Sequence, residues 1–250
     1  ENMHHSTTFS LYDSDVARIE QFGNKRRLIL HRSLRKKGIE IEDKKKGLYK
    51  AENENEGEKL DNNISRARSK IFELAYCNQW DYFVTLTINP EKYDRKNLNK
   101  YHKDLTQFFR DYKKKYDSKI DFILVPELHK DGSWHMHGLI KGILLQHLQK
   151  NEHGYLDWQH YKNKFGYISI DKIKSHDAVS RYMTKYITKD MKSNVTELGA
   201  HTYYRSRGLL EKKEIKRGTL IKNVSDWEYI NEYVKIKWLK DSEKIEDYIK

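Results

Sequence analysis

The chain has 250 residues and a formal net charge of +12, with 34% charged and 37% hydrophobic residues. This length fits one large domain or a domain with sizeable arms, and the 18 Tyr, 8 Phe and 5 Trp can fill a core, which argues against disorder. The positive charge favours a polyanionic partner, with a merely basic surface as the alternative. One cysteine excludes a disulfide framework and fits a reducing compartment. No apolar run is long enough to span a bilayer, so we expect no membrane partner.

The N-terminal part of the chain has the least regular pattern. Residues 27–31 predict a short strand. A cation-rich stretch over 35–46 is followed by an anion-rich stretch over 52–58, which is typical of a solvated or mobile linker. We therefore predict that residues 1–60 form a basic and acidic arm that is partly mobile.

The centre of the chain alternates strands with helices. In chain order we predict a helix over 62–78 capped by Asp61, a strand over 82–88, a helix over 95–116, strands over 121–127 and 134–141, a short helix over 144–150, a strand over 166–170 and a helix from Ser175 to about Asp190. The order β-α-β-β-α-β is that of the ferredoxin-like split unit. We therefore predict an α+β fold with a central antiparallel sheet, whose open face can receive single-stranded nucleic acid.

Two histidines, His135 and His137, lie on the second strand of the central pair. Residues two apart on a strand point to the same face, so the two imidazoles would lie side by side. Such a pair is by itself more often structural than functional. Glu127 on the preceding strand adds a carboxylate, and two imidazoles with one carboxylate make a divalent-metal site with positions open for a substrate. A single cysteine disfavours structural zinc, and a protein that handles phosphates would use Mg²⁺ or Mn²⁺.

The turn between these two strands decides whether Glu127 can take part. A two-residue loop would set Leu128 opposite His135 and turn Glu127 to the other face. A three-residue loop that ends with Gly132 in the left-handed conformation forms a bulge and sets Glu127 opposite His135. Because the glycine stands where the longer loop needs it, we predict the second register. The predicted metal ligands are Glu127, His135 and His137, with His129 in reserve.

A doubled Y-x-x-K pattern follows in the predicted helix at 175–190. Tyr182 and Tyr186 are four residues apart, which sets them about 40° apart around a helix and ~6 Å along it, so both can face one site. Lys185 and Lys189 each follow a tyrosine by three residues, near enough to stabilise a phenolate or a phosphate. Taken alone, the pattern is better explained as a helix that packs by its aromatic side.

The segment 201–209 interleaves aromatic residues with arginines. Stacking platforms beside phosphate-binding cations have this composition, and an ordinary edge strand is an equally good explanation. The remaining tail is expected to pack as a helix and a strand. The candidate nucleic-acid-binding residues are Tyr203, Tyr204, Arg205 and Arg207.

Three segments follow one another in a characteristic order: Phe83-Val84-Thr85-Leu86-Thr87, then residues 127–137, then Tyr186-Ile187-Thr188-Lys189-Asp190. They resemble the first motif, the metal motif and the nucleophile motif of rolling-circle replication initiators (Rep proteins) of the HUH endonuclease superfamily. The spacing from glutamate to histidines is similar to that of geminivirus Rep proteins. The doubled tyrosine pattern is similar to Rep proteins of small single-stranded DNA phages. The resemblance covers residues 82–190, and the flanking segments match nothing.

The resemblance implies an HUH core and a metal-dependent endonuclease that nicks and rejoins single-stranded DNA at a replication origin through a 5′-phosphotyrosyl intermediate. Tyr186 would be the main nucleophile, because single-tyrosine relatives have theirs at the Tyr-Ile-x-Lys-Asp position. Tyr182 would be the second nucleophile, assisted with Tyr186 by Lys189 and Lys185. The implied partners are single-stranded or hairpin origin DNA and a host helicase and polymerase, in the cytoplasm of a bacterium that carries a phage or plasmid.

We therefore expect an N-terminal arm (1–60), an HUH core (61–192) and a C-terminal extension (193–250) that packs on the core. Two alternatives stay open. A single-strand transposase or a conjugative relaxase would use the same chemistry, although the paired tyrosines and the short flanks speak against them. A non-catalytic sheet that binds single-stranded nucleic acid would use the aromatic residues and cations alone.

Overall fold

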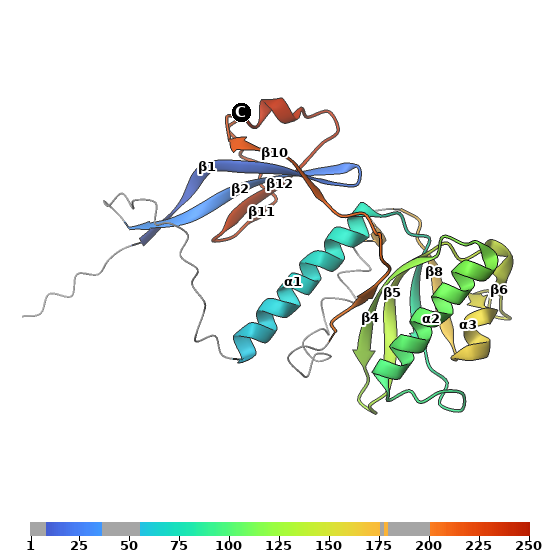
Figure 1. Cartoon of the computed structure of the whole chain (residues 1–250). Helices are drawn as coiled ribbons and strands as arrows, with labels where there is room; N and C mark the ends of the chain where they lie inside the picture. Colours follow the sequence, from blue (N-terminus) through green and yellow to red (C-terminus); the bar gives the residue numbers. More distant parts are fainter. Residues whose placement is uncertain (1–8, 37–55, 176–177, 180–200) are drawn as a thin grey trace, which may run out of the picture. The chain divides into compact units, whose positions relative to one another are not determined.

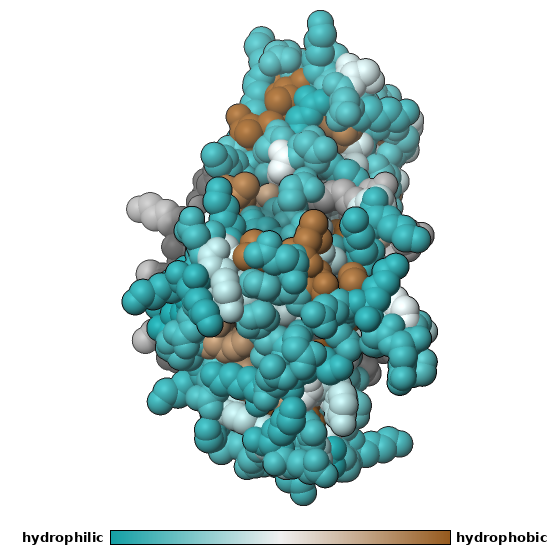
Figure 2. Space-filling view, turned by 90° about the vertical axis from the view of Figure 1, so that its right-hand side faces the viewer, coloured by the Kyte–Doolittle hydropathy of each residue, from teal (hydrophilic) through white to brown (hydrophobic). Residues whose placement is uncertain are grey.

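The computed structural model describes four parts of the chain, residues 9–36, 56–175, 178–179 and 201–250. The chain divides into two compact units, one made of residues 1–53 and 211–250 and the other of residues 54–210. Antiparallel sheets with few helices make the fold α+β, as predicted (Figure 1). The face seen in Figure 2 is largely hydrophilic, in keeping with 34% charged residues. None of the described helices is long and apolar enough to cross a membrane.

The larger unit, residues 54–210, contains all the described α-helices. These are α1 (Glu56–Cys77), α2 (Leu98–Tyr116) and α3 (Gln159–Lys164), with a 3-10 turn η1 (Leu145–His147). Its main sheet is built from β3 (Tyr82–Thr87), β4 (Asp121–Leu128), β5 (Trp134–Lys141), β8 (Ile168–Lys172) and β9 (Tyr204–Arg205). A separate two-stranded sheet pairs β6 (Leu148–Lys150) with β7 (Leu156–Trp158).

The main sheet has the strand order β8-β3-β5-β4-β9, and all its neighbours are antiparallel. Strands β3 and β4 are joined through α2, and β5 lies between them. This is the split β-α-β arrangement of the ferredoxin-like fold, as predicted. The strand order places the histidine strand β5 in the centre of the sheet, between the first-motif strand and the glutamate strand.

The two faces of this sheet carry separate hydrophobic clusters. The cluster on the α2 face includes Tyr101, Phe108, Met136, Trp158 and Phe165. The cluster on the other face joins strand residues such as Phe83, Val125 and Leu139 to α1. The α1 residues predicted to be apolar at helical spacing are all buried there: Ile64, Ala67, Ile71, Leu74 and Ala75.

Two local predictions in this unit are wrong. Asp61 does not cap α1, because the helix begins at Glu56, five residues earlier, through a segment of good helix formers. The short helix predicted over 144–150 is a 3-10 turn followed by β6, whose pairing with β7 satisfies the backbone. The helix that precedes β8 is instead α3, over residues 159–164.

The helix predicted from Ser175 begins as expected. The hydroxyl of Ser175 accepts a hydrogen bond from the backbone N–H of Ala178 at 3.3 Å, as an N-cap side chain does. Val179 is buried in the cluster that contains Val125 and Leu139. The start of this helix therefore packs on the α1 face of the sheet.

The smaller unit is a five-stranded antiparallel sheet with the order β10-β1-β2-β12-β11. Its elements are β1 (Phe9–Phe22), β2 (Lys25–Lys36), β10 (Lys213–Thr219), β11 (Tyr229–Ile230), β12 (Val234–Leu239) and the 3-10 turn η2 (Ile245–Asp247).

This sheet pairs the N-terminal hairpin with C-terminal strands, β1 with β10 and β2 with β12. The sequence predicts only residues 27–31 of the hairpin, because in β1 the buried Ala17 and Ile19 alternate with charged neighbours. The helix expected in the tail is only the short turn η2 in the fully described residues 211–250. The three-part division of the chain stays a prediction.

Candidate functional site

The turn between β4 and β5 sets the register of the candidate site. The backbone N–H of His129 donates to the carbonyl of Ser133 at 2.9 Å, which leaves three residues in the loop. Gly132 has φ +80°, the left-handed conformation expected of it. Glu127 consequently pairs with His135, and Val125 with His137. The predicted register is confirmed.

Two threonines of the neighbouring strand β3 contact the histidine rings. Thr85 pairs with His137 and Thr87 with His135 across β3 and β5. The Oγ1 of Thr85 lies 3.0 Å from Nδ1 of His137, and the Oγ1 of Thr87 lies 3.4 Å from Nδ1 of His135. Each ring therefore turns its Nδ1 to a hydroxyl and directs Nε2 elsewhere. Histidine ligands of metals are commonly oriented in this way through the nitrogen that does not bind the metal.

Glu127 lies among the imidazoles. Its Oε2 is 2.5 Å from Nε2 of His137 and 3.2 Å from Nε2 of His129. The ring of His129 stacks on that of His135, with centroids 3.8 Å apart and planes 17° from parallel. One carboxylate and three imidazoles therefore gather where β4 and β5 meet the turn.

The electrostatics of this cluster favour an ionised carboxylate beside neutral imidazoles. Burial tends to raise the pKa of Glu127, but the hydrogen bond and charge of His137, together with His129, hold it below its usual value. Burial lowers the pKa of His135, and the nearby His129 and His137 lower it further. A carboxylate and neutral imidazoles are the protonation states that metal ligands require.

The donor chemistry fits a hard divalent cation, but the side-chain positions do not form a finished site. Within the described residues, no group of three or more His, Cys, Asp or Glu side chains has the arrangement of a metal site. Glu127 and His137 are in contact, whereas His135 faces Thr87 and His129. The shared face of the three predicted ligands is confirmed, and their convergence on one ion stays a prediction.

The four predicted residues of the tyrosine helix, Tyr182, Lys185, Tyr186 and Lys189, lie outside the described residues. The described start of this helix, through Val179, packs on the face of the sheet that carries the histidines. Their expected roles stay predictions.

The predicted DNA-binding segment divides into buried aromatics and exposed cations. Tyr204 is 7% exposed and its ring stacks on His102 with centroids 3.6 Å apart, so it cannot offer its ring to a base. Tyr203 is partly buried against the α1-face cluster. Arg205 and Arg207 are exposed. The aromatic part of this prediction is corrected for Tyr204, because α2 supplies a histidine that covers it.

Sequence reasoning missed the roles of Thr85 and Thr87 beside the histidines. The signal was present, because both threonines occur at alternate positions of one strand, as the histidines do. It also missed two cations of α2, Arg110 and Lys113, which lie near Arg205 and Arg207 around one pocket. No sequence pattern connects these, since α2 and β9 are about 90 residues apart in the chain.

Comparison with known proteins places a replication family on this part of the chain. No curated protein and no solved structure matches the chain. Residues 81–191 match a family model for replication-associated proteins of the ORF2 type. The matched segment begins at β3, contains the β4–β5 hairpin and extends through the tyrosine pattern. Over these residues the chain is similar to replication-associated proteins, which supports a role as a replication initiator.

Proposed function

We propose that the chain is a Rep-type endonuclease that nicks and rejoins single-stranded DNA at a rolling-circle replication origin. The observation that carries this proposal is the register of the hairpin, in which Glu127 lies opposite His135 and touches His137. An open-sided cluster of one carboxylate and imidazoles on a protein with net charge +12 fits chemistry on a phosphate. The match of residues 81–191 to a replication-associated family supports the choice of origin DNA as substrate.

Glu127, His135 and His137 would hold one Mg²⁺ or Mn²⁺ ion, with His129 as a further candidate ligand. When bound, the ion supplies Lewis-acid stabilisation of charge on the scissile phosphate. Thr85 and Thr87 keep the two rings of the H-x-H pair turned so that Nε2 faces the cluster. The open side of the cluster leaves room for the phosphate.

The covalent step assigns Tyr186 as the nucleophile. Its phenol loses a proton, its oxygen bonds to phosphorus, and the bond from phosphorus to the 3′-oxygen breaks; that oxygen takes up a proton. The products are a 5′-phosphotyrosyl link and a 3′-OH end. Lys189 and Lys185 would stabilise the phenolate, and Tyr182 would serve in the second transfer. Attack of a 3′-OH on the phosphotyrosyl bond rejoins the strands without ATP.

The product ends define the partners. The 3′-OH end is a primer for a host polymerase, and a host helicase would open the strands ahead of it. The substrate would be single-stranded or hairpin origin DNA, in the cytoplasm of a bacterium that carries the phage or plasmid. A transposase or relaxase would perform the same covalent step on other DNA, so the experiment below tests the chemistry first.

The test is covalent capture of an origin oligonucleotide labelled at its 3′ end, which stays with the protein after cleavage. The wild-type protein should form a labelled adduct with Mn²⁺ or Mg²⁺ and none in EDTA, while DNA binding persists in EDTA because it depends mainly on cations. Tyr186→Phe should abolish or greatly reduce the first adduct. Tyr182→Phe should still form it and be impaired in strand transfer.

Tyr155→Phe is the matched control, since Tyr155 is 67% exposed on the turn between β6 and β7 and has no proposed role. Mass spectrometry of the trapped peptide identifies the linked residue. Nucleotide found on Tyr182 alone would reverse the assignment of the two tyrosines. DNA binding with no adduct on either tyrosine would favour a non-catalytic binding module.

A further inference from the structure

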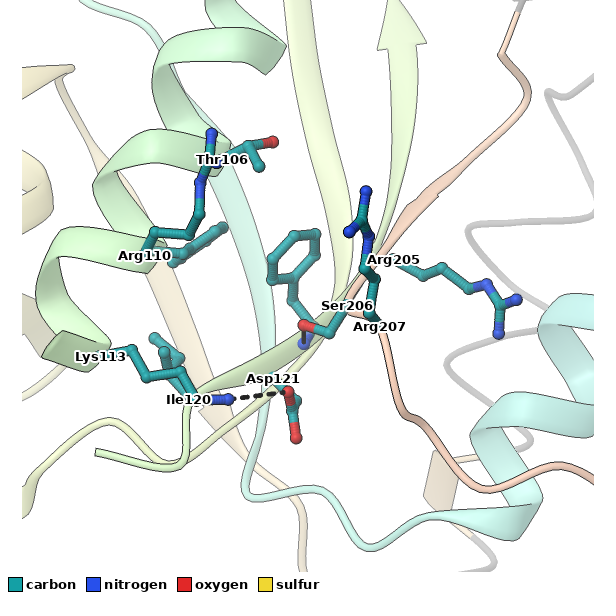
Figure 3. A pocket seen from close by; sticks show the side chains of 10 residues that line it. Thr106, Arg110, Lys113, Ile120, Asp121, Arg205, Ser206 and Arg207 are labelled. Carbon is teal, nitrogen blue, oxygen red and sulfur yellow. Dashed lines mark hydrogen bonds and ion pairs between the residues drawn. The ribbon is translucent and has the colours of Figure 1, made fainter. Parts of the chain in front are cut away.

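A pocket of about 380 Å³ lies between α2 and the segment that contains β9. Arg110 and Lys113 line it from α2, and Arg205 and Arg207 line it from the opposite side (Figure 3). Its remaining lining residues are Thr106, Phe109, Ile120, Asp121, Phe122 and Ser206. Four cations therefore surround a cavity that has one carboxylate.

The carboxylate does not neutralise these cations. Asp121 is 3.9 Å from Lys113 and 3.4 Å from Lys141, which lies outside the pocket lining. Among the described residues, neither Arg110 nor Arg207 forms a salt bridge, and both are exposed. The pocket therefore keeps a net positive charge that an anion can balance.

The walls of the pocket are held in place by the fold. Ser206 donates its N–H to the carbonyl of Phe122 at 3.0 Å, and its hydroxyl accepts from the N–H of Phe122 at 3.0 Å. Phe109 of α2 packs on Phe122, with ring centroids 4.5 Å apart. The cations thus project from a helix and from a tied segment around an apolar floor. Sites that bind small phosphorylated groups combine these features.

The pocket and the histidine cluster lie on opposite faces of the sheet. Phe122 belongs to the α2-face cluster, whereas Glu127 lies on the face of the histidines. Both residues are on β4, five positions apart, which corresponds to about 17 Å along a strand. β9 forms the edge of the sheet beside β4. A strand of DNA at the cluster would reach the pocket by passing around this edge.

We propose that this pocket binds a phosphate-bearing nucleotide of the DNA strand outside the bond that is cut, so that the DNA contacts both faces of the sheet. The inference rests on the proposed function for the identity of the DNA. Arg110 and Lys113 are one turn apart on α2, about 4.5 Å along its axis, close enough to neutralise neighbouring phosphates. The cations supply affinity without reading sequence.

The test measures binding of oligothymidylates of about 5, 10, 15 and 20 nucleotides to the full chain in EDTA, by fluorescence anisotropy at several salt concentrations. The double variant Arg110→Gln/Arg207→Gln removes two exposed cations. It should bind the shortest oligonucleotide as the wild type does and the longest on the order of tenfold more weakly. The salt dependence of its affinity for the longest oligonucleotide should become shallower, by about 0.7 in slope for each phosphate that the variant no longer neutralises.

The charge control is Lys115→Gln, which removes a cation from another side of the same helix. Its Nζ lies 5.2 Å from the ring centroid of Tyr116, and it does not line the pocket. This variant should keep the affinity of the wild type for every length. An equal loss in the control and the double variant would attribute the effect to general charge and overturn the proposal.

Two further outcomes would also overturn it. One is an unchanged affinity of the double variant for long DNA. The other is loss of dTTP binding by the double variant with long DNA still bound normally, which would make the pocket a site for a free nucleotide. Because these measurements need neither metal nor a tyrosine, failure of covalent capture would defeat the proposed function and leave the binding result to decide the pocket.

Discussion

The two faces of the sheet in residues 54–210 are built from the same strands and have different contents. The face toward α2 is closed by aromatic side chains, including Trp158, Tyr161 and Phe165, each 0% exposed. The other face is apolar beside α1 and changes at one end to Glu127, His135 and the threonines of β3. Alternate residues of a strand point to opposite faces, so one strand can supply both. Stability and chemistry are therefore separable by position along β5.

Replacing Phe165 by alanine should have the largest effect on stability. Its ring packs against Tyr93, Tyr101 and Tyr161, with centroids 5.5, 5.5 and 5.3 Å away, and the cavity left behind should cost about 3–5 kcal/mol. Denaturant unfolding monitored by circular dichroism measures this loss. Tyr167→Ala is the control, since that side chain is 61% exposed. A loss below about 1 kcal/mol for Phe165→Ala would mean that the α2 face does not carry the stability.

His135→Ala should reverse the balance between stability and activity. The side chain is half-buried in a polar cluster, so unfolding should shift by no more than about 1 kcal/mol. Covalent capture of DNA should fall by on the order of a hundredfold or more, because a ligand of the catalytic ion is removed. Binding of the oligonucleotide should persist. Normal adduct formation by this variant would remove the metal assignment.

Thr85→Val should weaken metal binding without removing a ligand. The valine keeps the shape of the side chain but lacks the hydroxyl that lies 3.0 Å from Nδ1 of His137. Removal of such an orienting group typically reduces metal affinity by about 10–100-fold. Mn²⁺ titration by calorimetry on the protein alone measures the change. Thr85→Ser retains the hydroxyl and should restore affinity, and equal weakening in both variants would contradict the orienting role.

The smallest expected effect is the pH dependence of the contribution of Glu127 to stability. The net pKa of this carboxyl lies below its ordinary value of 4.5, so the folded state favours its ionised form. The stabilisation is present above the ordinary pKa and is lost as the pH falls through the lowered one. In metal-free buffer, the difference in Tm between wild type and Glu127→Gln should shrink between about pH 7 and pH 3.5. A difference independent of pH, or one matched by Glu91→Gln on the exposed loop after β3, would contradict the contact with His137.

The sequence predicts features that depend on local geometry. The glycine at position 132 is sufficient to choose the turn, and the turn places Glu127 opposite His135. The strand order follows from the sequence of elements, because a helix crossover and a tight hairpin leave few arrangements.

Features that depend on distant residues could not be predicted in this way. The ring of Tyr204 is covered by His102, which belongs to a helix far away in the sequence. Strand β1 was hidden because Ala17 and Ile19 are small or isolated among charged residues, and their burial depends on strands at the other end of the chain. The pocket cations likewise come together only in the folded unit.

The three-residue turn at Gly132 has a consequence for how insertions and deletions act on this protein. Shortening the turn by one residue would move every side chain of one strand to the opposite face. Glu127 would then be driven among aromatic rings, and Met136 or its neighbours would be displaced from the core. A chain with the wrong turn length would fail to fold before it could lose only its chemistry. Folding itself thus acts as a proofreading step for the alignment of carboxylate and imidazole.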